Sequence, residues 1–380
     1  MSEESRALIA LKMIRGVGDG IVRTLLQHFG SAVEALAATA EQLAEAAGVG
    51  RETAQRITSD REAALQRAER EQDFAQKHGA RIYTLPDEAY PTRLRACPDA
   101  PSVVYYRGAD CLNAAHIVSI VGTRRCTEYG LAMTARLVEG LAAADPSTVV
   151  ISGLAYGIDV NAHRNALRVG LPTIGVLAHG LDKIYPAAHR QIAADMLARG
   201  GLLTDYPSGT NPARENFLLR NRLIAALADA TVVVESAERG GALSTAAHAR
   251  NYGRSVFAVP GRATDEHSAG CLHLIARGRA ELITSAADLC QLMGWTQTGT
   301  LSDATNRSAH PSAPLRPPVA SVPLPDNAVT RVLLAEGATQ INDLARLSDL
   351  SVREVMAVLF DLEMDGLVTT LPGGVYKLVK

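Results

Sequence analysis

The stretch Val149-Val-Ile-Ser-Gly-Leu-Ala-Tyr-Gly-Ile-Asp159 leads from a short apolar run through a glycine loop into a helical segment. Similar apolar runs recur along the chain, separated by amphipathic stretches of about 10–15 residues. Strands that alternate with helices in this way predict a parallel sheet with helices on both faces. The sequence therefore predicts an α/β fold over residues 81–295. The other runs are Ile117–Val121, Thr173–Leu177, Leu202–Leu203, Thr231–Val234 and Val256–Val259.

The composition is that of a globular protein. The chain has 380 residues, of which 47% are hydrophobic and 21% charged, and this excludes a disordered or fibrous chain. At about 100–200 residues per domain, two to four domains fit. The formal net charge is −2, so no overall positive field attracts nucleic acid. Any binding of nucleic acid must come from a local patch.

The sequence carries no signal for a membrane or an oxidising compartment. No apolar run reaches the roughly 18 residues that span a bilayer, and the first residues are acidic where a signal peptide is basic. We therefore expect a cytoplasmic protein with no membrane partner. Five scattered cysteines without a C-x-x-C pair predict reduced thiols and no zinc site. The cysteines are Cys97, Cys111, Cys126, Cys271 and Cys290.

Residues 1–80 read as a helical domain. Two short glycine turns, Arg15-Gly-Val-Gly18 and Ala47-Gly-Val-Gly50, stand between apolar helical segments. The pattern is that of a helix-hairpin-helix of the SAM-like kind, whose turn can present helix amides to a phosphate. A plain helix–helix turn in a small bundle explains the same residues.

Two further segments follow the α/β region. Residues 296–327 hold six of the seventeen prolines and predict a flexible linker. In residues 328–380, a capping box at Ser351-Val-Arg-Glu354 opens a helix, and two strands follow about the turn Pro372-Gly-Gly374. Helices followed by a hairpin predict a winged helix.

Three of the predicted strands end in small or basic residues. Glycines let backbone amides approach an anion, and the helix that follows favours negative charge. Because the carboxyl ends of parallel strands meet at one edge, these loops predict a phosphate pocket. Two arginines two apart, at the start of a further helix, add fork-like phosphate donors. The candidate residues are Gly122, Thr123, Arg124, Ser152, Gly153, Gly157, Arg220, Asn221, Arg222, Gly240, Gly241 and Ser244.

The sequence lacks the usual motifs for nucleotide hydrolysis and dinucleotide redox chemistry, because no Walker A sequence occurs and no G-x-G-x-x-G follows a strand. It also has no carboxylate cluster at metal-ligand spacing. We therefore predict no catalytic residue, metal or cofactor. Asp159 and His163 lie four apart on one helix and could form an acid/base pair. The alternative is that Asp159 complements the helix dipole, while His163 packs in the core or faces a phosphate.

Several motifs together resemble the DNA-processing protein A family (DprA, also called Smf) over nearly the whole chain. Those in the sheet region are Val121–Arg124 with Tyr129-Gly130, Ser152–Asp159 with Ala162-His163, Gly180–Pro186, Arg220-Asn-Arg222 and Val259-Pro-Gly261. Upstream, Tyr90-Pro91, Leu94 and Tyr106-x-Gly108 match the lead-in of the family.

The resemblance implies a Rossmann-like core with an N-terminal helical domain and a C-terminal winged helix. It also implies a homodimer that binds single-stranded DNA without cutting it and loads the recombinase RecA onto it in natural transformation. Lys183 and His163 join the candidate DNA contacts on this ground. Tyr156 stands where the family often has Lys or Arg, and its ring could stack on a base instead.

Two other functions remain open. A Rossmann-like phosphoribohydrolase would bind a nucleotide and cleave its glycosidic bond, with Glu235 at a strand end as its carboxylate. A protein-interaction scaffold with a vestigial pocket would neither bind DNA nor cleave a nucleotide.

The winged helix is acidic where a DNA reader is basic. Its last helix carries Arg353 against Glu354, Asp361, Glu363 and Asp365. We therefore expect this domain to bind protein; the alternative is DNA contact through Lys377 and Lys380.

Overall fold

The computed structural model describes residues 2–295, 324–364, 367–371 and 374–379. They form two compact units, Met1–Leu289 and Cys290–Lys380. Most of the linker predicted at 296–327 lies outside the described residues.

The first unit begins with five helices. Side chains cap several of them: Ser2 accepts from the amide of Ser5, and Thr39 with Gln42 forms a reciprocal capping box. Each predicted glycine turn contains a residue with positive φ, Gly16 or Gly48, which favours glycine. The helices are α1 (Glu3–Met13), α2 (Asp19–Phe29), α3 (Ala32–Ala37), α4 (Ala40–Glu45) and α5 (Arg51–His78).

The sheet of the first unit is mostly parallel, and the predicted α/β fold is confirmed. Its order in the described chain is β1-β2-β6-β5-β4-β3-β7-β8-β9, with the pairs β1–β2 and β2–β6 antiparallel and the others parallel. The strands are β1 (Arg81–Thr84), β2 (Val103–Gly108), β3 (Ile117–Val121), β4 (Val149–Ser152), β5 (Thr173–Val176), β6 (Gly201–Thr204), β7 (Ala230–Val233), β8 (Ser255–Ala258) and β9 (Glu281–Leu282).

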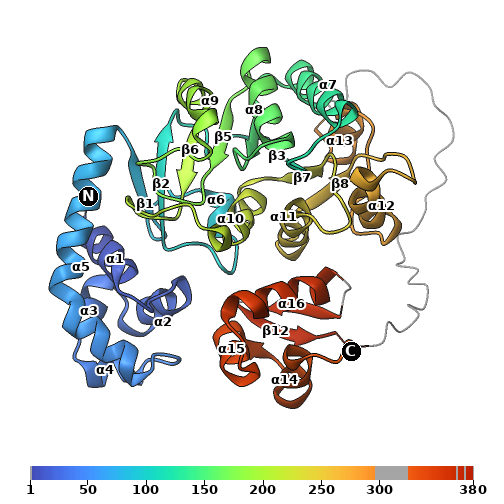
Figure 1. The fold of residues 1–380 in the computed structure, drawn as a ribbon. Helices are drawn as coiled ribbons and strands as arrows, with labels where there is room; N and C mark the ends of the chain where they lie inside the picture. The colour runs from blue at the N-terminus through green and yellow to red at the C-terminus, as the bar shows by residue number, and fades with distance from the viewer. Residues whose placement is uncertain (1, 296–323, 365–366, 372–373, 380) are drawn as a thin grey trace. The chain divides into compact units, whose positions relative to one another are not determined.

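Helices cover both faces of this sheet, which is why its central strands are buried throughout. α7 (Glu128–Ala144), α8 (Ile158–Val169) and α9 (Arg190–Met196) lie on one face, and α10 (Arg214–Leu227) and α11 (Gly241–Asn251) lie on the other (Figure 1). The remaining helices are α6 (Thr92–Arg95), α12 (Ala269–Ala276) and α13 (Ala286–Leu292).

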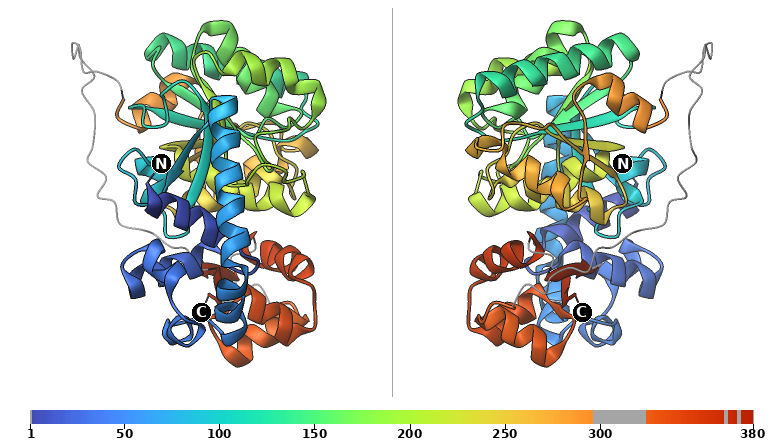
Figure 2. Two further views of the ribbon diagram at one scale, coloured as in Figure 1. Left: turned by 90° about the vertical axis from the view of Figure 1, so that its left-hand side faces the viewer. Right: turned by 90° about the vertical axis from the view of Figure 1, so that its right-hand side faces the viewer.

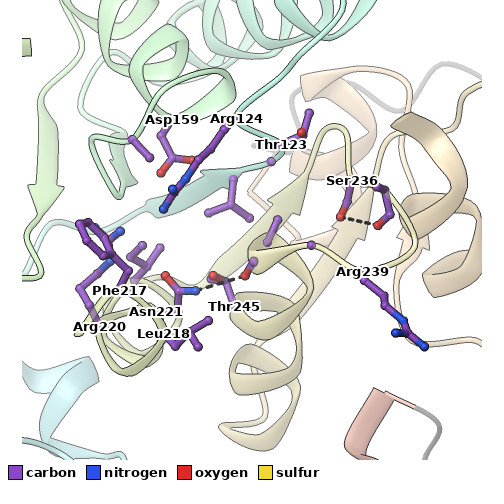
Figure 3. A pocket seen from close by; sticks show the side chains of 18 residues that line it. Thr123, Arg124, Asp159, Phe217, Leu218, Arg220, Asn221, Ser236, Arg239 and Thr245 are labelled. Atoms are coloured by element: carbon purple, nitrogen blue, oxygen red, sulfur yellow. Dashed lines mark hydrogen bonds between the residues drawn. The ribbon is translucent and has the colours of Figure 1, made fainter. Parts of the chain in front are cut away.

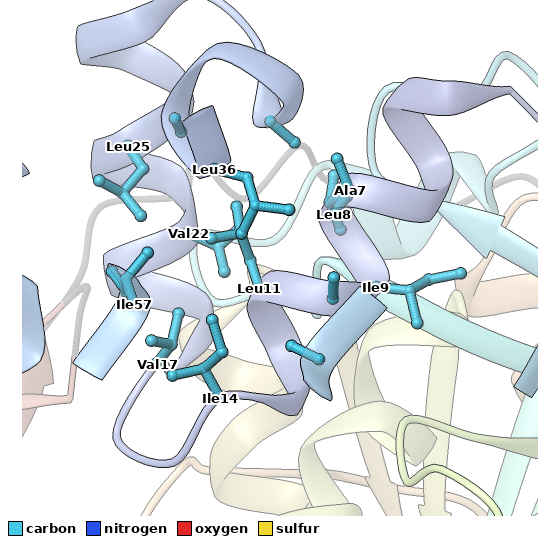
Figure 4. Packing of buried hydrophobic residues seen from close by; sticks show 14 of the residues in the cluster. Ala7, Leu8, Ile9, Leu11, Ile14, Val17, Val22, Leu25, Leu36 and Ile57 are labelled. Atoms are coloured by element: carbon cyan, nitrogen blue, oxygen red, sulfur yellow. The ribbon is translucent and has the colours of Figure 1, made fainter. Parts of the chain in front are cut away.

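The helical region and the sheet share one hydrophobic core. Leu8, Leu11, Leu25 and Ile57 are completely buried in it, as Figure 4 shows in part. Side chains of β2 belong to the same cluster, so the helical bundle packs directly on the sheet. α5 runs from the bundle along the outer strands, as the two views of Figure 2 agree.

The second unit is the predicted winged helix. It comprises α14 (Ala328–Glu336), β10 (Thr339–Gln340), α15 (Ile341–Ser348), α16 (Val352–Met364), β11 (Val368–Leu371) and β12 (Val375–Leu378). Its strands form a small sheet in the order β10-β12-β11. The predicted capping box is present, with the Ser351 amide donating to Glu354 at 2.9 Å. No helix among the described residues is long and apolar enough to cross a bilayer.

Candidate nucleic-acid interface

The strand order reverses beside β3. The chain proceeds from β3 through β4 and β5 to β6 on one side, and from β7 through β8 to β9 on the other. Loops that leave neighbouring strands in opposite directions open a crevice at their carboxyl ends, where ligands bind in such sheets. A pocket of about 220 Å³ lies there, lined by the loops after β3 and β7 together with α10 (Figure 3).

The loop after β3 forms one wall. A Cβ on Gly122 would lie 2.5 Å from the side chain of Ile158, so only glycine allows this close approach. The Thr123 amide donates to the Glu235 carbonyl at 2.7 Å and fixes the loop. Arg124 is exposed, and its guanidinium lies 5.6 Å from the centre of the Phe217 ring. The loop thus presents a cation over an aromatic face.

The N-terminus of α11 forms the opposite wall. Gly240, Gly241 and Ala242 line the pocket at the start of this helix. Within the described chain no side chain caps its first turn. The positive end of the helix dipole therefore borders the pocket.

The charges around the pocket are mainly positive. Arg124, Arg220 and Arg239 line it, and Asp159 is the one carboxylate among its described lining residues. Arg239 is exposed at the rim (Figure 3). This excess of cations and the α11 N-terminus give the pocket an electrostatic environment that favours an anionic group such as phosphate.

Arg220 is buried at the floor of the pocket. It is 3% exposed and donates to the carbonyl of Gly153 at 2.7 Å and to that of Val176. Burial lowers its pKa to about 10, so it stays charged at neutral pH. The Gly153 amide donates to the carboxylate of Asp159 at 3.1 Å, and burial raises the pKa of Asp159. Arg220 therefore contributes a positive charge to the pocket and also fixes the backbone at Gly153 and Val176.

Of the candidate residues, seven line the pocket: Gly122, Thr123, Arg124, Arg220, Asn221, Gly240 and Gly241. The others shape its surroundings or lie apart from it. Ser152 is buried and donates to the Ile120 carbonyl at 2.6 Å, and Ser244 is buried in α11. Gly153 leaves room for the Arg220 guanidinium, and Gly157 has φ +78°. These four residues have structural roles in this geometry.

His163 does not line the pocket. It is completely buried, and its Nδ1 lies 2.7 Å from the hydroxyl of Thr173. Burial lowers the pKa of His163 to about 3, so the imidazole is neutral. The geometry corresponds to the packed alternative and gives no support to the acid/base pair or to the candidate contact.

Arg222 points away from the pocket, contrary to our expectation that it joins Arg220 there. Its guanidinium lies 2.7 Å from Asp205 and 3.8 Å from Asp19, and it also donates to the Asp99 carbonyl. Although burial opposes the charge, Asp205 and Asp19 raise the pKa of Arg222. Two positions along a helix turn a side chain by about 200°, which sends these two arginines to opposite sides.

A rim of aromatic and basic side chains extends from the pocket. The ring of Tyr185, half exposed, lies 5.7 Å from that of Phe217. Lys183 donates to the Asn211 side chain at 2.5 Å, and Tyr156 is half exposed against His189. Phe217, Tyr185 and Arg239 were not among our candidates. A basic residue directly before Gly240 was the signal that would have identified Arg239.

Glu235, the carboxylate of the enzyme alternative, is not in the pocket lining. It is 1% exposed and accepts from the amide of Thr127 at 2.9 Å and from its hydroxyl at 2.5 Å. Thr127 is the N-cap of α7, so Glu235 stabilises the start of that helix. The described residues also contain no cluster of three or more side chains that could hold a metal.

Family models identify all three parts of the chain. Residues 81–294 match the model of DNA recombination-mediator protein A. The chain belongs to this family. Residues 313–374 match the DprA winged helix domain, and residues 8–62 match a SAM-like helix-hairpin-helix tandem, so the resemblance seen in the sequence is confirmed.

Relatives in the DprA/Smf family extend over the whole chain. Protein Smf from Synechocystis is 32% identical over 99% of this chain and 99% of its own length. The X-ray structure of DprA from Streptococcus pneumoniae covers 77% of this chain and 98% of its own, at 31% identity and a TM-score of 0.66. A Helicobacter pylori DprA structure, whose description concerns its single-stranded DNA binding mode, covers 57% and 96%, at 30% identity and a TM-score of 0.51.

Proposed function

We propose that this chain binds single-stranded DNA in the pocket between β3 and β7. The observation that carries the proposal is that Arg124, Arg239 and the α11 N-terminus line one pocket at the topological switch point of the sheet. These groups recognise a phosphate and leave the bases free. The single-stranded DNA binding mode described for the H. pylori relative supports the same ligand.

Aromatic rings beside the pocket favour single strands over duplex. Phe217 and Tyr185 offer faces on which unstacked bases can rest, and stacking tolerates any sequence. Lys183 lies in the connection after β5, which also carries Tyr185, and Tyr156 lies in the connection after β4. Both are further candidate contacts with DNA. We expect little sequence preference.

Membership of the DprA/Smf family supports the remaining parts of the proposal. The chain forms a homodimer in the cytoplasm, loads RecA onto the bound strand in recombination and natural transformation, and has no catalytic activity of its own. A dimer mass by light scattering would support the homodimer. A faster onset of RecA ATPase activity on oligo-dT in the presence of this protein would support RecA loading.

The deciding experiment is a gel-shift series with single-stranded and duplex oligonucleotides of equal length at two salt concentrations. We expect tighter binding of the single strand and binding that weakens steeply with salt. Equal affinity for the duplex would contradict the proposal. Release of free base from nucleoside monophosphates would instead support the phosphoribohydrolase alternative.

A further inference from the structure

The helical domain holds residues 205–211, which form most of the connection between β6 and α10. Glu71 on α5 is completely buried and accepts from the amide of Ser208 at 2.8 Å and from its hydroxyl at 2.6 Å. Arg67, one turn earlier on α5, lies 2.7 Å from Glu71 and donates to the Ser208 carbonyl. Burying a carboxylate costs free energy unless hydrogen bonds or an ion pair compensate for the lost water. The contacts of Glu71 with Ser208 and Arg67 supply this compensation, so they favour this position of the connection.

The start of the same connection has a second attachment to the helical domain. Asp205 pairs with Arg222, which also lies 3.8 Å from Asp19 of α2. Asp19 in turn pairs with Lys12 at 2.8 Å and accepts from the Ser102 amide at 2.8 Å. Both attachments are largely buried.

Residues 205–211 then hold the loop that carries Lys183 and Tyr185, residues 180–186. The Gly180 amide donates to the Thr210 carbonyl at 3.3 Å, and the Gly209 amide donates to Asp182 at 2.9 Å. Lys183 itself donates to Asn211 at 2.5 Å. Leu181 in this loop also packs against the hydrophobic cluster of the helical domain.

These contacts form a continuous path from the helical domain to the pocket rim. It runs from Glu71 to Ser208, from Asn211 to Lys183, and from Tyr185 to Phe217, which lines the pocket. A loop held at several points presents its side chains in one geometry, which lowers the entropic cost of binding a ligand.

We propose that Glu71 is a positioning residue for the Lys183 side of the interface. The helical domain then contributes to DNA binding without touching the strand, by fixing residues 205–211 and through them Lys183 and Tyr185. This inference rests on the proposed function, because it requires Lys183 to contact DNA.

A double-mutant cycle on the full chain tests the inference. Affinity for oligo-dT is measured by fluorescence anisotropy over a salt series for Glu71→Gln, Lys183→Ala and the double variant. We expect each single change to weaken binding about fivefold and to lower the salt slope by up to about 0.7. The double variant should bind as tightly as whichever single variant has the lower affinity. If Glu71→Gln already displaces Lys183 from the DNA, removing the Lys183 side chain causes no further loss of affinity.

Two further variants separate positioning from loss of fold. Glu69→Gln alters the same helix at an exposed position that pairs with Arg6, and it should bind like the wild type. Ser208→Ala removes the hydroxyl bond to Glu71 from the side of the loop and leaves the bond from the Ser208 amide, so it should show a smaller loss with the same coupling to Lys183 even if Glu71→Gln proves unstable.

Each outcome has one meaning. If Lys183→Ala weakens binding but Glu71→Gln and Ser208→Ala do not, or if the losses multiply, the positioning role is wrong and the proposed function stands. If Lys183→Ala is silent while Arg124→Ala weakens binding, the positioning role is wrong as well. If the wild type does not bind oligo-dT, the proposed function fails and the inference fails with it.

Discussion

Arg220 and Asp159 bind opposite ends of the same residue, Gly153. The carbonyl of Gly153 accepts from Arg220 at 2.7 Å, and its amide donates to Asp159 at 3.1 Å. The first residue of the loop after β4 is thereby fixed by a cation from α10 and a carboxylate from α8. A Cβ on Gly153 would lie within 2.7 Å of three guanidinium atoms, so the arrangement also requires glycine there.

Replacing Arg220 should therefore cost stability as well as affinity. We expect Arg220→Ala to lower the free energy of unfolding by about 3–5 kcal/mol, because it leaves the buried carbonyls of Gly153 and Val176 without their donor and removes a cation whose charge stabilises the Asp159 carboxylate. Denaturant titration measures this loss. Adding Asp159→Asn should recover part of it, and an additive further loss would show that the two side chains do not act as a pair.

Arg124 should contribute to binding without contributing to stability. Its side chain is exposed, and its guanidinium lies over the Phe217 ring. We expect Arg124→Ala to weaken single-strand binding for all sequences and to reduce the salt slope by about 0.7. Arg164→Ala removes the same charge from an exposed position on α8 that does not line the pocket, and it should change neither quantity. An unchanged salt slope in Arg124→Ala would remove Arg124 from the interface.

Glu235 should prove structural. Its buried carboxylate accepts two hydrogen bonds from Thr127 at the start of α7. We expect Glu235→Ala to lower the free energy of unfolding by about 1–3 kcal/mol. Glu238→Ala, an exposed change three residues on, should leave stability as it is. Hydrolysis of a nucleoside monophosphate by the wild type that is lost in Glu235→Ala would contradict this assignment.

His163 should make stability depend on pH. Burial holds its pKa at about 3 in the folded chain, below the value of 6.5 for a free histidine. The unfolded chain therefore binds one more proton between these values, and stability falls as pH falls through this range. Between pH 7.5 and pH 5, this group alone should remove about 2 kcal/mol. His163→Gln should flatten the pH dependence of urea unfolding, whereas His28→Gln, an exposed change, should not.

The winged helix should not bind DNA by itself. Among the described residues of α16, Arg353 stands against Glu354, Asp361 and Glu363, while Asp365 and Lys380 lie outside the described residues. Acidic groups repel phosphates, so a chain that ends at residue 320 should bind oligo-dT within about twofold of the full chain. Residues 321–380 alone should give no gel shift at moderate salt. A micromolar shift by that fragment would show that the hairpin with Lys377 contacts DNA.

The fold and the place of the pocket follow from local sequence patterns. Apolar runs followed by glycine loops predict strands whose carboxyl ends meet, and the loops carrying Gly122 and Gly240 do border one pocket. The two loops are more than a hundred residues apart in the sequence, yet each local pattern predicts its own strand and glycine loop without reference to the other.

The roles of individual polar side chains depend on distant partners and are not readable in this way. Arg220 and Arg222 look alike in the sequence, and Asp19 and Asp205 decide which of them leaves the pocket. A serine at the end of a strand suggests a ligand contact, but the Ser152 hydroxyl donates its hydrogen bond to the Ile120 carbonyl. Phe217 has no polar group that would suggest a ligand contact, and the packing of α10 brings it to the pocket.

The shared core of the helical bundle and β2 has a consequence for the solubility of the separate parts. Val103 and Tyr105 are almost completely buried, and the partly buried Ile82 and Leu181 pack against the same cluster. A chain that began at residue 81 would turn this surface into a contiguous apolar patch next to an edge strand. Such surfaces associate with their own copies. The sheet region without the N-terminal helical domain should therefore precipitate or form higher oligomers at concentrations where the full chain stays dispersed.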